Sequence, residues 1–429
     1  MTTFAITTLG CKVNTFETES YRESLEALGY AEVDFRQKAD VYVINTCCVT
    51  NTAASKSRQR ISQAKRHNPN ALLCVVGCYV QTHAEELKSQ LAIDILLGFS
   101  GKTRLAQMIQ NALLKKPLVL LDVEPNSFVF EELNVHKFQH QTRAYLKIQD
   151  GCDQFCAYCI IPYARGRERS LNPTNVVKQA QLLSESHPEI VLVGIHTGRF
   201  GKEYGVDLTQ MIEEILDNTP KLKRIRISSI EVTEITAAFI ALMKREPRIA
   251  RHLHIPIQSG CDATLLRMQR PYTVKDYLEK IAAIRKEIPD ISISSDLIVG
   301  FPQEDEDEFL TTMQTMRTAE FSFMHVFPYS RRANTGADKM DGHISPQCKK
   351  QRVQTAKNVS YALHQKFLKR LIGKPLEVIV EEISEIGLFG HSSEYIPVMI
   401  PYIKQHQPKD WIEVIAVAIK EGNLIGEEH

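Results

Sequence analysis

Short apolar runs alternate with helix-length amphipathic segments along the first third of the chain. The apolar runs cover residues 4–10, 41–47 and 72–78, and the amphipathic segments cover residues 17–28, 52–66 and 82–91. This alternation predicts a parallel sheet with helices on its faces. We therefore expect an open, doubly wound α/β domain over residues 1–116. Residues 117–143 have no clean period and are expected to form a connector.

The alternation of apolar runs and amphipathic segments resumes at residue 144. Apolar runs cover residues 144–149, 190–194, 224–228, 252–256, 292–299 and 322–327, and most are separated by amphipathic segments at 174–187, 208–218, 233–245, 273–287 and 305–318. Successive strand and helix units predict a (β/α)6 partial TIM barrel over residues 144–344. In such a barrel the loops at the carboxyl ends of the strands carry the chemistry.

The pattern changes again near residue 345. Residues 345–374 hold eight basic residues and no acidic ones on a helix-compatible stretch, so we expect a basic helical linker over 345–372. The runs LEVIVEEI, YIPVMI and WIEVIAVAI then alternate over short distances. They predict a small β-barrel domain over residues 373–429.

The composition is that of a packed globular protein. Of the 429 residues, 43% are apolar and 24% are charged, and the formal net charge is +1. A disordered chain is excluded, and any nucleic-acid surface must be local because the molecule carries no charge excess. The N-terminal stretch has no basic leader, and no apolar run approaches the roughly 18 residues of a membrane span. We expect a cytoplasmic protein with no membrane or DNA partner.

The cysteines give the strongest chemical signal. Ten in this length are too few for a disulfide scaffold and favour metal binding in a reducing compartment. Cys152, Cys156 and Cys159 directly follow the first predicted barrel strand. No fourth cysteine follows before Cys261, so three thiolates would leave one metal position open. The alternative is a structural zinc site with a distant fourth ligand, although such sites are usually four-coordinate and closed.

A second set of cysteines repeats one offset. Cys11, Cys47 and Cys78 each follow a predicted strand of the N-terminal sheet. Because the carboxyl ends of parallel strands share one edge, these thiols are expected to meet there and to hold a second metal cluster. The alternative is that they are small buried apolar residues. We take Cys48, Cys74, Cys261 and Cys348 as non-ligands, although Cys48 is able to exchange roles with its neighbour Cys47.

The three-cysteine loop at the mouth of a predicted (β/α)6 barrel resembles the radical S-adenosylmethionine (SAM) superfamily. That resemblance implies a [4Fe–4S] cluster on Cys152, Cys156 and Cys159 whose open iron binds SAM, and an electron donor such as flavodoxin or ferredoxin. It also places Tyr158 near the adenine of SAM, although packing beneath the loop explains this aromatic side chain equally well.

Further strings resemble the radical SAM methylthiotransferases over nearly the whole chain. They are LGCKVNTFETE, NTCCVTNTAASKSRQ, VVGCYVQ, IQDGCDQFCAYCIIPYARGRERS, GIHTG, HIPIQSG, SDLIVGFP and HVFPYS. The resemblance implies a second [4Fe–4S] cluster on Cys11, Cys47 and Cys78 and a TRAM-like C-terminal β domain. Gln303 stands where the family usually has glycine, a departure confined to one turn.

The tripeptide Lys12-Val13-Asn14 resembles the branch of the family that acts on N(6)-threonylcarbamoyladenosine. The implied reaction adds a methylthio group to C2 of this adenine at position 37, next to the anticodon, in the anticodon stem-loop of tRNA. The C2–H bond is not acidic enough for a side-chain base, so a radical takes its place. Alternatives are isopentenyladenosine in tRNA or a ribosomal protein side chain as substrate, or a non-catalytic, metal-stabilised RNA-binding protein.

Several polar residues are weaker candidates for SAM contacts. They are Glu231, Gln258 and Asp296, which lie at predicted strand ends, and Arg169 from the basic run of Arg165, Arg167 and Arg169. For the first three a structural hydrogen bond is equally plausible. For the arginines we favour contact with substrate phosphate or the SAM carboxylate over a solvated face. We expect His196, His254 and His325 to be interior residues rather than ligands.

The expected tRNA surface lies outside the C-terminal domain. Residues 375–429 hold ten acidic and three basic residues, a balance of 3 − 10 = −7, which is unfavourable for binding phosphate. We therefore predict that tRNA is bound by the basic stretch 345–374 together with Lys56, Arg58, Arg60, Lys65 and Arg66.

Overall fold

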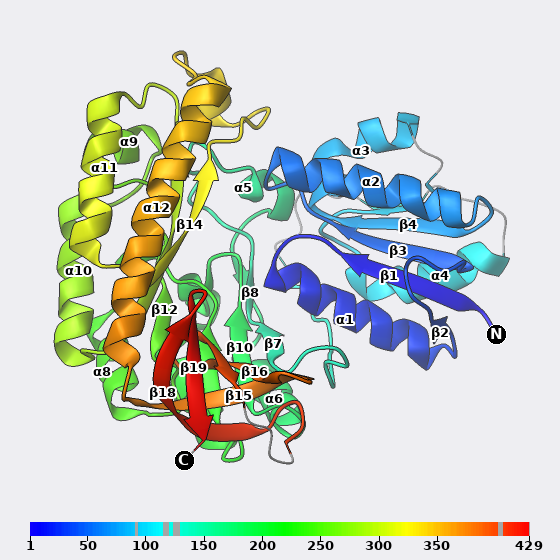
Figure 1. The fold of residues 1–429 in the computed structure, drawn as a ribbon. Helices are drawn as coiled ribbons and strands as arrows, with labels where there is room; N and C mark the ends of the chain where they lie inside the picture. The colour runs from blue at the N-terminus through cyan, green and yellow to red at the C-terminus, as the bar shows by residue number, and fades with distance from the viewer. Residues whose placement is uncertain (91–92, 115–119, 123–128, 402–405, 429) are drawn as a thin grey trace.

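The computed structural model describes residues 1–90, 93–114, 120–122, 129–401 and 406–428. An open sheet, a partial barrel with outer helices and a small closed β-barrel follow one another along the chain (Figure 1). No helix in these residues combines the length and the apolar character that a membrane crossing requires.

The N-terminal sheet is parallel throughout, in the order β2-β1-β3-β4-β5-β6. Its strands are β1 Thr3–Thr8, β2 Ala31–Glu32, β3 Val41–Thr46, β4 Leu72–Gly77, β5 Ile95–Leu97 and β6 Leu120–Asp122. Its helices are α1 Lys12–Ala27, α2 Asn51–His67, α3 Cys78–Gln90, η1 Lys102–Arg104 and α4 Leu105–Leu114. Helices α1 and α4 pack on one face of the sheet and α2 and α3 on the other. The prediction of a doubly wound sheet is confirmed.

Three local features differ from the sequence pattern. Helix α1 begins at Lys12, five residues before the predicted 17, and α3 begins at Cys78, four residues before the predicted 82. The first turn of each helix lies at the carboxyl edge of the sheet, next to the cysteines. These turns therefore lack the apolar periodicity that marks a helix elsewhere. Residues 120–122 form a strand within the predicted connector, because three residues are too short to show a period. Residues 117–119 and 123–128 of that connector lie outside the described residues.

The central part is a parallel six-stranded partial barrel. Its strands are β7 Ala144–Lys147, β10 Glu189–Val193, β11 Arg224–Ile227, β12 His252–His254, β13 Ser292–Val299 and β14 Phe323–Pro328. Sheets β11-β10-β7 and β12-β13-β14 are joined by a parallel bridge between Ile225 and Ile249. The outer helices are α6 Pro173–Ser184, α7 Leu208–Asn218, α8 Ala237–Arg245, α10 Val274–Glu287 and α11 Glu306–Ala319. The predicted barrel is confirmed.

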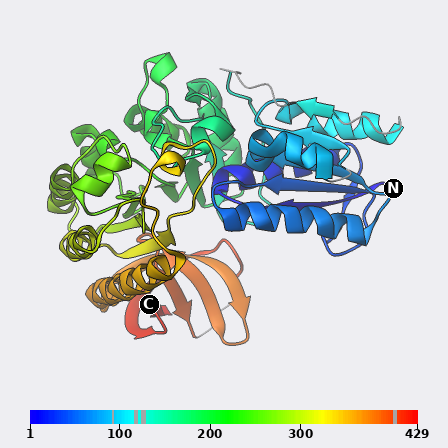
Figure 2. The ribbon, with the colours of Figure 1, turned by 90° about the horizontal axis from the view of Figure 1, so that it is seen from above.

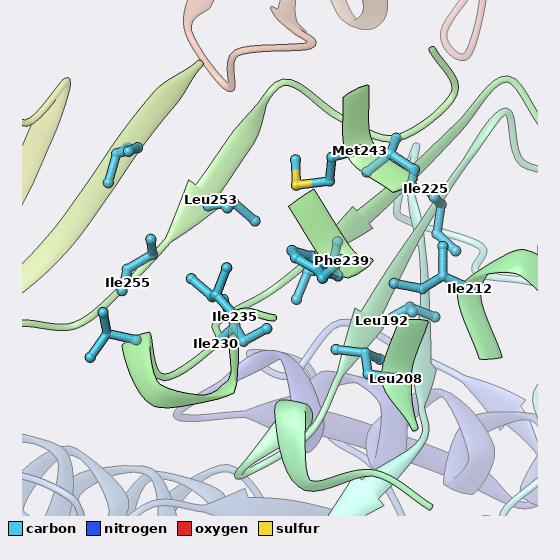
Figure 3. Packing of buried hydrophobic residues seen from close by; sticks show 14 of the residues in the cluster. Leu192, Leu208, Ile212, Ile225, Ile230, Ile235, Phe239, Met243, Leu253 and Ile255 are labelled. Atoms are coloured by element: carbon cyan, nitrogen blue, oxygen red, sulfur yellow. The ribbon is translucent and has the colours of Figure 1, made fainter. Parts of the chain in front are cut away.

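Apolar side chains fill the space between these strands and the helices. Figure 3 shows Leu192, Ile225 and Leu253 from three neighbouring strands beside Ile212 of α7 and Phe239 of α8. All five are almost fully buried. This packing leaves the loops at the strand ends free to carry polar chemistry.

The loops of the partial barrel contain short strands and helices. They are β8 Gln149–Asp150, α5 Ile161–Arg165, β9 Arg169–Ser170, η2 Thr197–Arg199, η3 Lys202–Tyr204, η4 Val232–Glu234, α9 Asp262–Arg267 and η5 Gly336–Lys339. Gln303 takes a φ of +64°, in the left-handed region that favours glycine. A glycine would adopt this conformation without strain, so the turn is one that suits the glycine expected from the family resemblance.

The chain ends in a long helix and a closed barrel. Helix α12, Pro346–Leu371, packs along β14, and Figure 2 shows it between the partial barrel and the C-terminal strands. The closed barrel has the order β15-β16-β17-β19-β18. Its strands are β15 Pro375–Ser384, β16 Gly387–Ser392, β17 Pro397–Ile400, β18 Trp411–Lys420 and β19 Asn423–Glu428. The predicted small β-barrel is confirmed.

The C-terminal barrel sits against the end of the partial barrel where the strands begin. Glu189, at the start of β10, pairs with Arg224 at 3.1 Å and Arg226 at 2.7 Å. Arg224 lies 4.3 Å from the ring centroid of Trp411, and Arg226 donates to the backbone oxygens of the turn after β16. The loops at the opposite end, where we expect the chemistry, remain uncovered by this domain (Figure 1).

Candidate active site

Cys11, Cys47 and Cys78 lie together at the carboxyl edge of the N-terminal sheet. They follow the ends of β1, β3 and β4, which are neighbours in the sheet. Burial raises the pKa of the Cys47 thiol to about 12, and the nearby thiols of Cys78 and Cys11 add to the effect. Gly10 has a φ of +107°, and a Cβ there would stand 3.1 Å from the sulfur of Cys47. The close approach of two strand ends therefore requires glycine.

Cys78 receives hydrogen bonds from two sides. Cys48 donates its S–H to the sulfur of Cys78, which lowers the pKa of the Cys78 thiol against the effect of burial. The Nε–H of Arg165 donates to the same sulfur over 3.1 Å. A thiolate is the form that binds iron or zinc, so this environment suits a metal ligand. Cys48 lies beside this set and contacts Cys78.

Cys152, Cys156 and Cys159 lie in the loop between β8 and α5. Burial raises the pKa of Cys159 to about 12, with contributions from the neighbouring thiols of Cys156 and Cys152. Phe155, inside the loop, has a φ of +48°, an uncommon conformation for an aromatic residue. The loop holds the three thiols near one another, and a set of three thiolates fits a [4Fe–4S] cluster with one open iron.

Two nitrogen donors approach this second trio. Nη1 of Arg270 donates to the sulfur of Cys156 over 3.2 Å, and Nδ1 of His196 lies 3.6 Å from the sulfur of Cys152. Burial opposes charge on His196, but hydrogen bonds with Cys152, Glu168 and Glu234 raise the pKa of the imidazole to about 12. Ligand atoms of Cys152, Glu168 and His196 lie within 4.8 Å of one another, a geometry that also suits a metal ion.

A cavity of about 250 Å³ lies where the partial barrel meets the N-terminal domain, and Cys159 is the one cysteine among the described residues that line it. Its barrel wall includes three predicted residues, Tyr158, Gln258 and Asp296, together with Cys159. Its other wall comes from the N-terminal domain, at Val49 and Thr50 directly after Cys47 and Cys48. Residues 327–330, at the end of β14 and directly after it, also line the cavity. The cavity therefore contacts both domains, and its volume lies just below the range of about 300–1,000 Å³ that is usual for ligand pockets.

Glu231 lies one contact away from this cavity. Its carboxylate pairs with the guanidinium of Arg270, which also donates to the Tyr158 hydroxyl at 3.5 Å. Arg270 lies 4.9 Å from the centroid of the Tyr272 ring. The structure thus joins Glu231 to the cysteine loop through one buried arginine, a residue that the sequence pattern did not single out. No local motif marks Arg270, because its partners are distant in sequence.

The structure places two of the three arginines of the basic run after the cysteine loop in buried ion pairs. Arg169 is 5% exposed, pairs with Asp150 at 3.3 Å and donates to the backbone oxygen of Arg165 at 2.8 Å. Arg165 is 1% exposed. Both side chains neutralise buried carboxylates and are turned away from solvent, so neither is placed to bind substrate phosphate. Arg167 is half-exposed and pairs with Asp153.

Of the three histidines expected to be interior, His196 is buried, His254 is half-buried and His325 is exposed on β14, so the expectation is wrong for His325. His254 contacts the hydroxyl of Ser294 at 2.9 Å through Nδ1 and lies 3.3 Å from Asp296 through Nε2. The His325 ring lies 6.0 Å from that of His254. His254 therefore orients a carboxylate that lines the cavity. His196 instead lies beside a predicted cluster ligand, which sets it apart from an ordinary interior histidine.

Sequence reasoning missed a buried ionic network between the two domains. Glu17 accepts from Lys102 at 2.7 Å, Lys147 at 3.0 Å and Arg165 at 2.6 Å. Against the effect of burial, these three cations hold the pKa of Glu17 below its usual range. Val13, at the start of α1, packs in the same interface against the barrel strand β10. The network ties α1 to the partial barrel, so the two cysteine sets are held in fixed relation.

Two family models match the chain. Residues 3–98 match "Uncharacterized protein family UPF0004", and residues 146–316 match the "Radical SAM superfamily". Among solved structures, the radical SAM methyltransferase TsrM from Kitasatospora setae is similar with a TM-score of 0.59 over 79% of this chain and 77% of that one. At 13% identity, this similarity concerns the fold alone.

The curated relatives cover most of the chain. The threonylcarbamoyladenosine tRNA methylthiotransferase MtaB of Bacillus subtilis is 41% identical over 93% of this chain and 90% of its own length. MtaB of Thermotoga maritima is 35% identical over 92% of this chain and 90% of its own. The tRNA-2-methylthio-N(6)-dimethylallyladenosine synthase of Lachnoclostridium phytofermentans is 34% identical over 89% and 85%.

The three-cysteine loop at the mouth of a partial (β/α)6 barrel, with the matching family model, defines a radical SAM enzyme. Radical SAM enzymes use a [4Fe–4S] cluster and SAM, and the non-catalytic alternative is thereby excluded. Within this class, the chain belongs to the family of MtaB-type methylthiotransferases.

Proposed function

We propose that this enzyme adds a methylthio group to C2 of N(6)-threonylcarbamoyladenosine at position 37 of tRNA. The proposal includes a [4Fe–4S] cluster on Cys152, Cys156 and Cys159 and a second on Cys11, Cys47 and Cys78. The names of the MtaB relatives support the substrate. The convergence of three sulfurs at each of the two places supports the clusters.

The observation that carries this proposal is the cavity shared by the two domains. Transfer of a methylthio group to an unactivated ring carbon needs a sulfur source and a radical source at one substrate atom. Cys159 lines the cavity from the barrel, and Val49 and Thr50 line it beside Cys47. A base inserted there would lie beside Cys159 and close to the residues that follow Cys47. Proteins usually read RNA bases that a single-stranded loop presents in this way.

The chain's own residues bind SAM and the nucleoside and orient them. When bound, the clusters and SAM supply the sulfur, the methyl group and the one-electron chemistry. Asp296, held by His254, and Gln258 offer polar contacts to SAM or to the nucleoside. Tyr158 offers an aromatic surface to the adenine of SAM, and Ile160 and Phe327 give the same cavity apolar walls. An external donor such as flavodoxin or ferredoxin is proposed to supply electrons.

Disruption of the gene is expected to remove the 2-methylthio derivative of N(6)-threonylcarbamoyladenosine from cellular tRNA, while its unmodified precursor accumulates. Nucleoside mass spectrometry of total tRNA measures both. Complementation with the intact chain restores the product, and complementation with the C152A/C156A/C159A variant does not. Loss of the isopentenyladenosine derivative instead would reassign the substrate. An unchanged nucleoside profile would favour a ribosomal protein side chain.

The structure revises the predicted tRNA surface on α12. Arg352 is buried and pairs with Glu304 at 2.9 Å, so it holds the helix against the barrel rather than facing solvent. Lys366 pairs with Glu320, and Lys374 pairs with Asp290 at 2.7 Å. These charges are already neutralised. We therefore propose that tRNA contacts three exposed lysines of α12, Lys350, Lys357 and Lys369, and two exposed basic residues of α2, Lys56 and Arg66.

Charge reversal of these five residues, K56E/R66E/K350E/K357E/K369E, is expected to weaken tRNA binding and to flatten its salt dependence. For every phosphate that the variant no longer binds, the slope of log K against log salt decreases by roughly 1. Filter binding across a salt series measures both quantities. The control is K275E on α10, whose lysine is also exposed. Unchanged affinity in the fivefold variant would place the tRNA on another face.

A further inference from the structure

One guanidinium connects the two cysteine sets. Arg165 ends α5, six residues after Cys159, and its side chain is 1% exposed. Its Nε–H donates over 3.1 Å to the sulfur of Cys78, in the other domain. The residue is thus attached by its backbone to one set and by its side chain to the other.

The remaining nitrogens of Arg165 are also engaged. Nη1 donates to Glu17 at 2.6 Å and to Asp150 at 3.4 Å, and Nη2 donates to the side-chain oxygen of Asn14. The amide nitrogen of Asn14 in turn donates to the backbone oxygens of Leu9, at 2.7 Å, and of Thr46. Contacts on every nitrogen fix the orientation of the guanidinium, so the Nε–H stays directed at Cys78.

A fixed cationic donor beside a ligand sulfur has a known electronic effect. Reduction of an iron–sulfur cluster adds negative charge, part of which resides on the sulfurs. Hydrogen bonds to these sulfurs and nearby positive charge stabilise the reduced state and raise the reduction potential. Glu17 has the opposite sign and acts on Cys78 in the opposite sense. The two residues therefore set the electrostatic balance at this sulfur between them.

We propose that Arg165 is a positioning residue that raises the reduction potential of the cluster on Cys11, Cys47 and Cys78. This inference rests on the proposed function, because the second cluster is part of that proposal. Arg270 provides the corresponding donor for the other set, at 3.2 Å from Cys156. Each cluster then has a buried arginine of its own, and the two potentials are set independently.

The test is a redox titration of the holoenzyme followed by electron paramagnetic resonance, with SAM added to identify the signal of the SAM-binding cluster. R165Q is expected to shift the potential of the second cluster to a more negative value. E17Q, which keeps Arg165, is expected to shift it to a more positive value. Shifts of opposite sign cannot arise from general loosening of the interface, which both substitutions would cause.

Further variants keep the test informative if R165Q does not fold. Removing Arg165 alone leaves Glu17 and Asp150 with one cation fewer in a buried site, which is costly. The double variant R165Q/E17Q removes one charge of each sign and is expected to fold and to keep a smaller negative shift. R165K retains the charge and should fall between R165Q and the unaltered protein. R245Q, from an exposed arginine at the end of α8, should leave both potentials unchanged.

The outcomes separate this inference from the proposed function. R270Q should move only the potential of the SAM-binding cluster. Iron analysis showing about four irons per chain rather than about eight would overturn the second cluster and the proposed function with it. About eight irons, with a potential that R165Q and E17Q leave unmoved or move in the same direction, would overturn the role of Arg165 alone.

Discussion

Substitution of Cys156 by alanine is expected to abolish the reductive cleavage of SAM. Formation of 5′-deoxyadenosine should fall by about three orders of magnitude or more, equivalent to about 4 kcal/mol of lost transition-state stabilisation. The reason is that Cys156 is one of three sulfurs in the loop between β8 and α5 and lies under the donor group of Arg270. The two cysteines that remain are too few to hold the proposed cluster.

Chromatography with mass spectrometry measures 5′-deoxyadenosine after anaerobic reconstitution and reduction with dithionite. Iron should fall from about eight to about four per chain, because the other set of cysteines is intact. C348A is the matched control, since Cys348 lies on α12 in neither set. Undiminished 5′-deoxyadenosine from C156A would remove this loop from the chemistry.

Substitution of Cys47 by alanine is expected to separate methylthiolation from the reductive cleavage of SAM. The methylthiolated nucleoside should be lost, while 5′-deoxyadenosine is still formed. The two sets of cysteines belong to different domains and share no ligand, so removing Cys47 leaves the ligands of the other set in place. Product and 5′-deoxyadenosine are quantified in the same assay with tRNA as substrate.

The neighbouring residue supplies the control. C48A removes an S–H donor to Cys78 but no ligand of the proposed cluster, so about eight irons and most of the activity should remain. The reverse pattern, with C47A active and C48A inactive, would exchange the two residues in the ligand assignment. Loss of 5′-deoxyadenosine in C47A would contradict the independence of the two sites.

The fold could be predicted from the sequence because its elements are strongly periodic. The strand at 292–299 has the predicted bounds, and the helix at 208–218 does as well. The pattern failed where local sequence serves the site. The first turns of α1 and α3 carry Asn14 and Cys78, whose partners lie in the other domain or on neighbouring strands. Such turns are stabilised by distant contacts and show no apolar repeat.

The candidate site divides in the same way. Spacing alone predicts that Cys152, Cys156 and Cys159 surround one point, since a short loop brings its own residues together. Strand order predicts that Cys11 and Cys47 share an edge. The chemistry of Arg165 and Arg169 was not accessible in this way. A basic run is consistent with either a solvated phosphate site or a buried ion pair, and only the positions of Glu17 and Asp150 decide between them.

The sequence by itself determined the order of the three parts, the periodicity of their elements and the cysteine sets, because each depends on residues close together or on strand ends that parallel pairing must align. Tertiary structure alone decided how the parts meet. It placed Val13 against β10, directed the Nε–H of Arg165 at Cys78 and formed one cavity from Thr50 and Cys159. These contacts join residues far apart in the chain. Because the charged groups are buried, the charge state of each depends on all of its neighbours together.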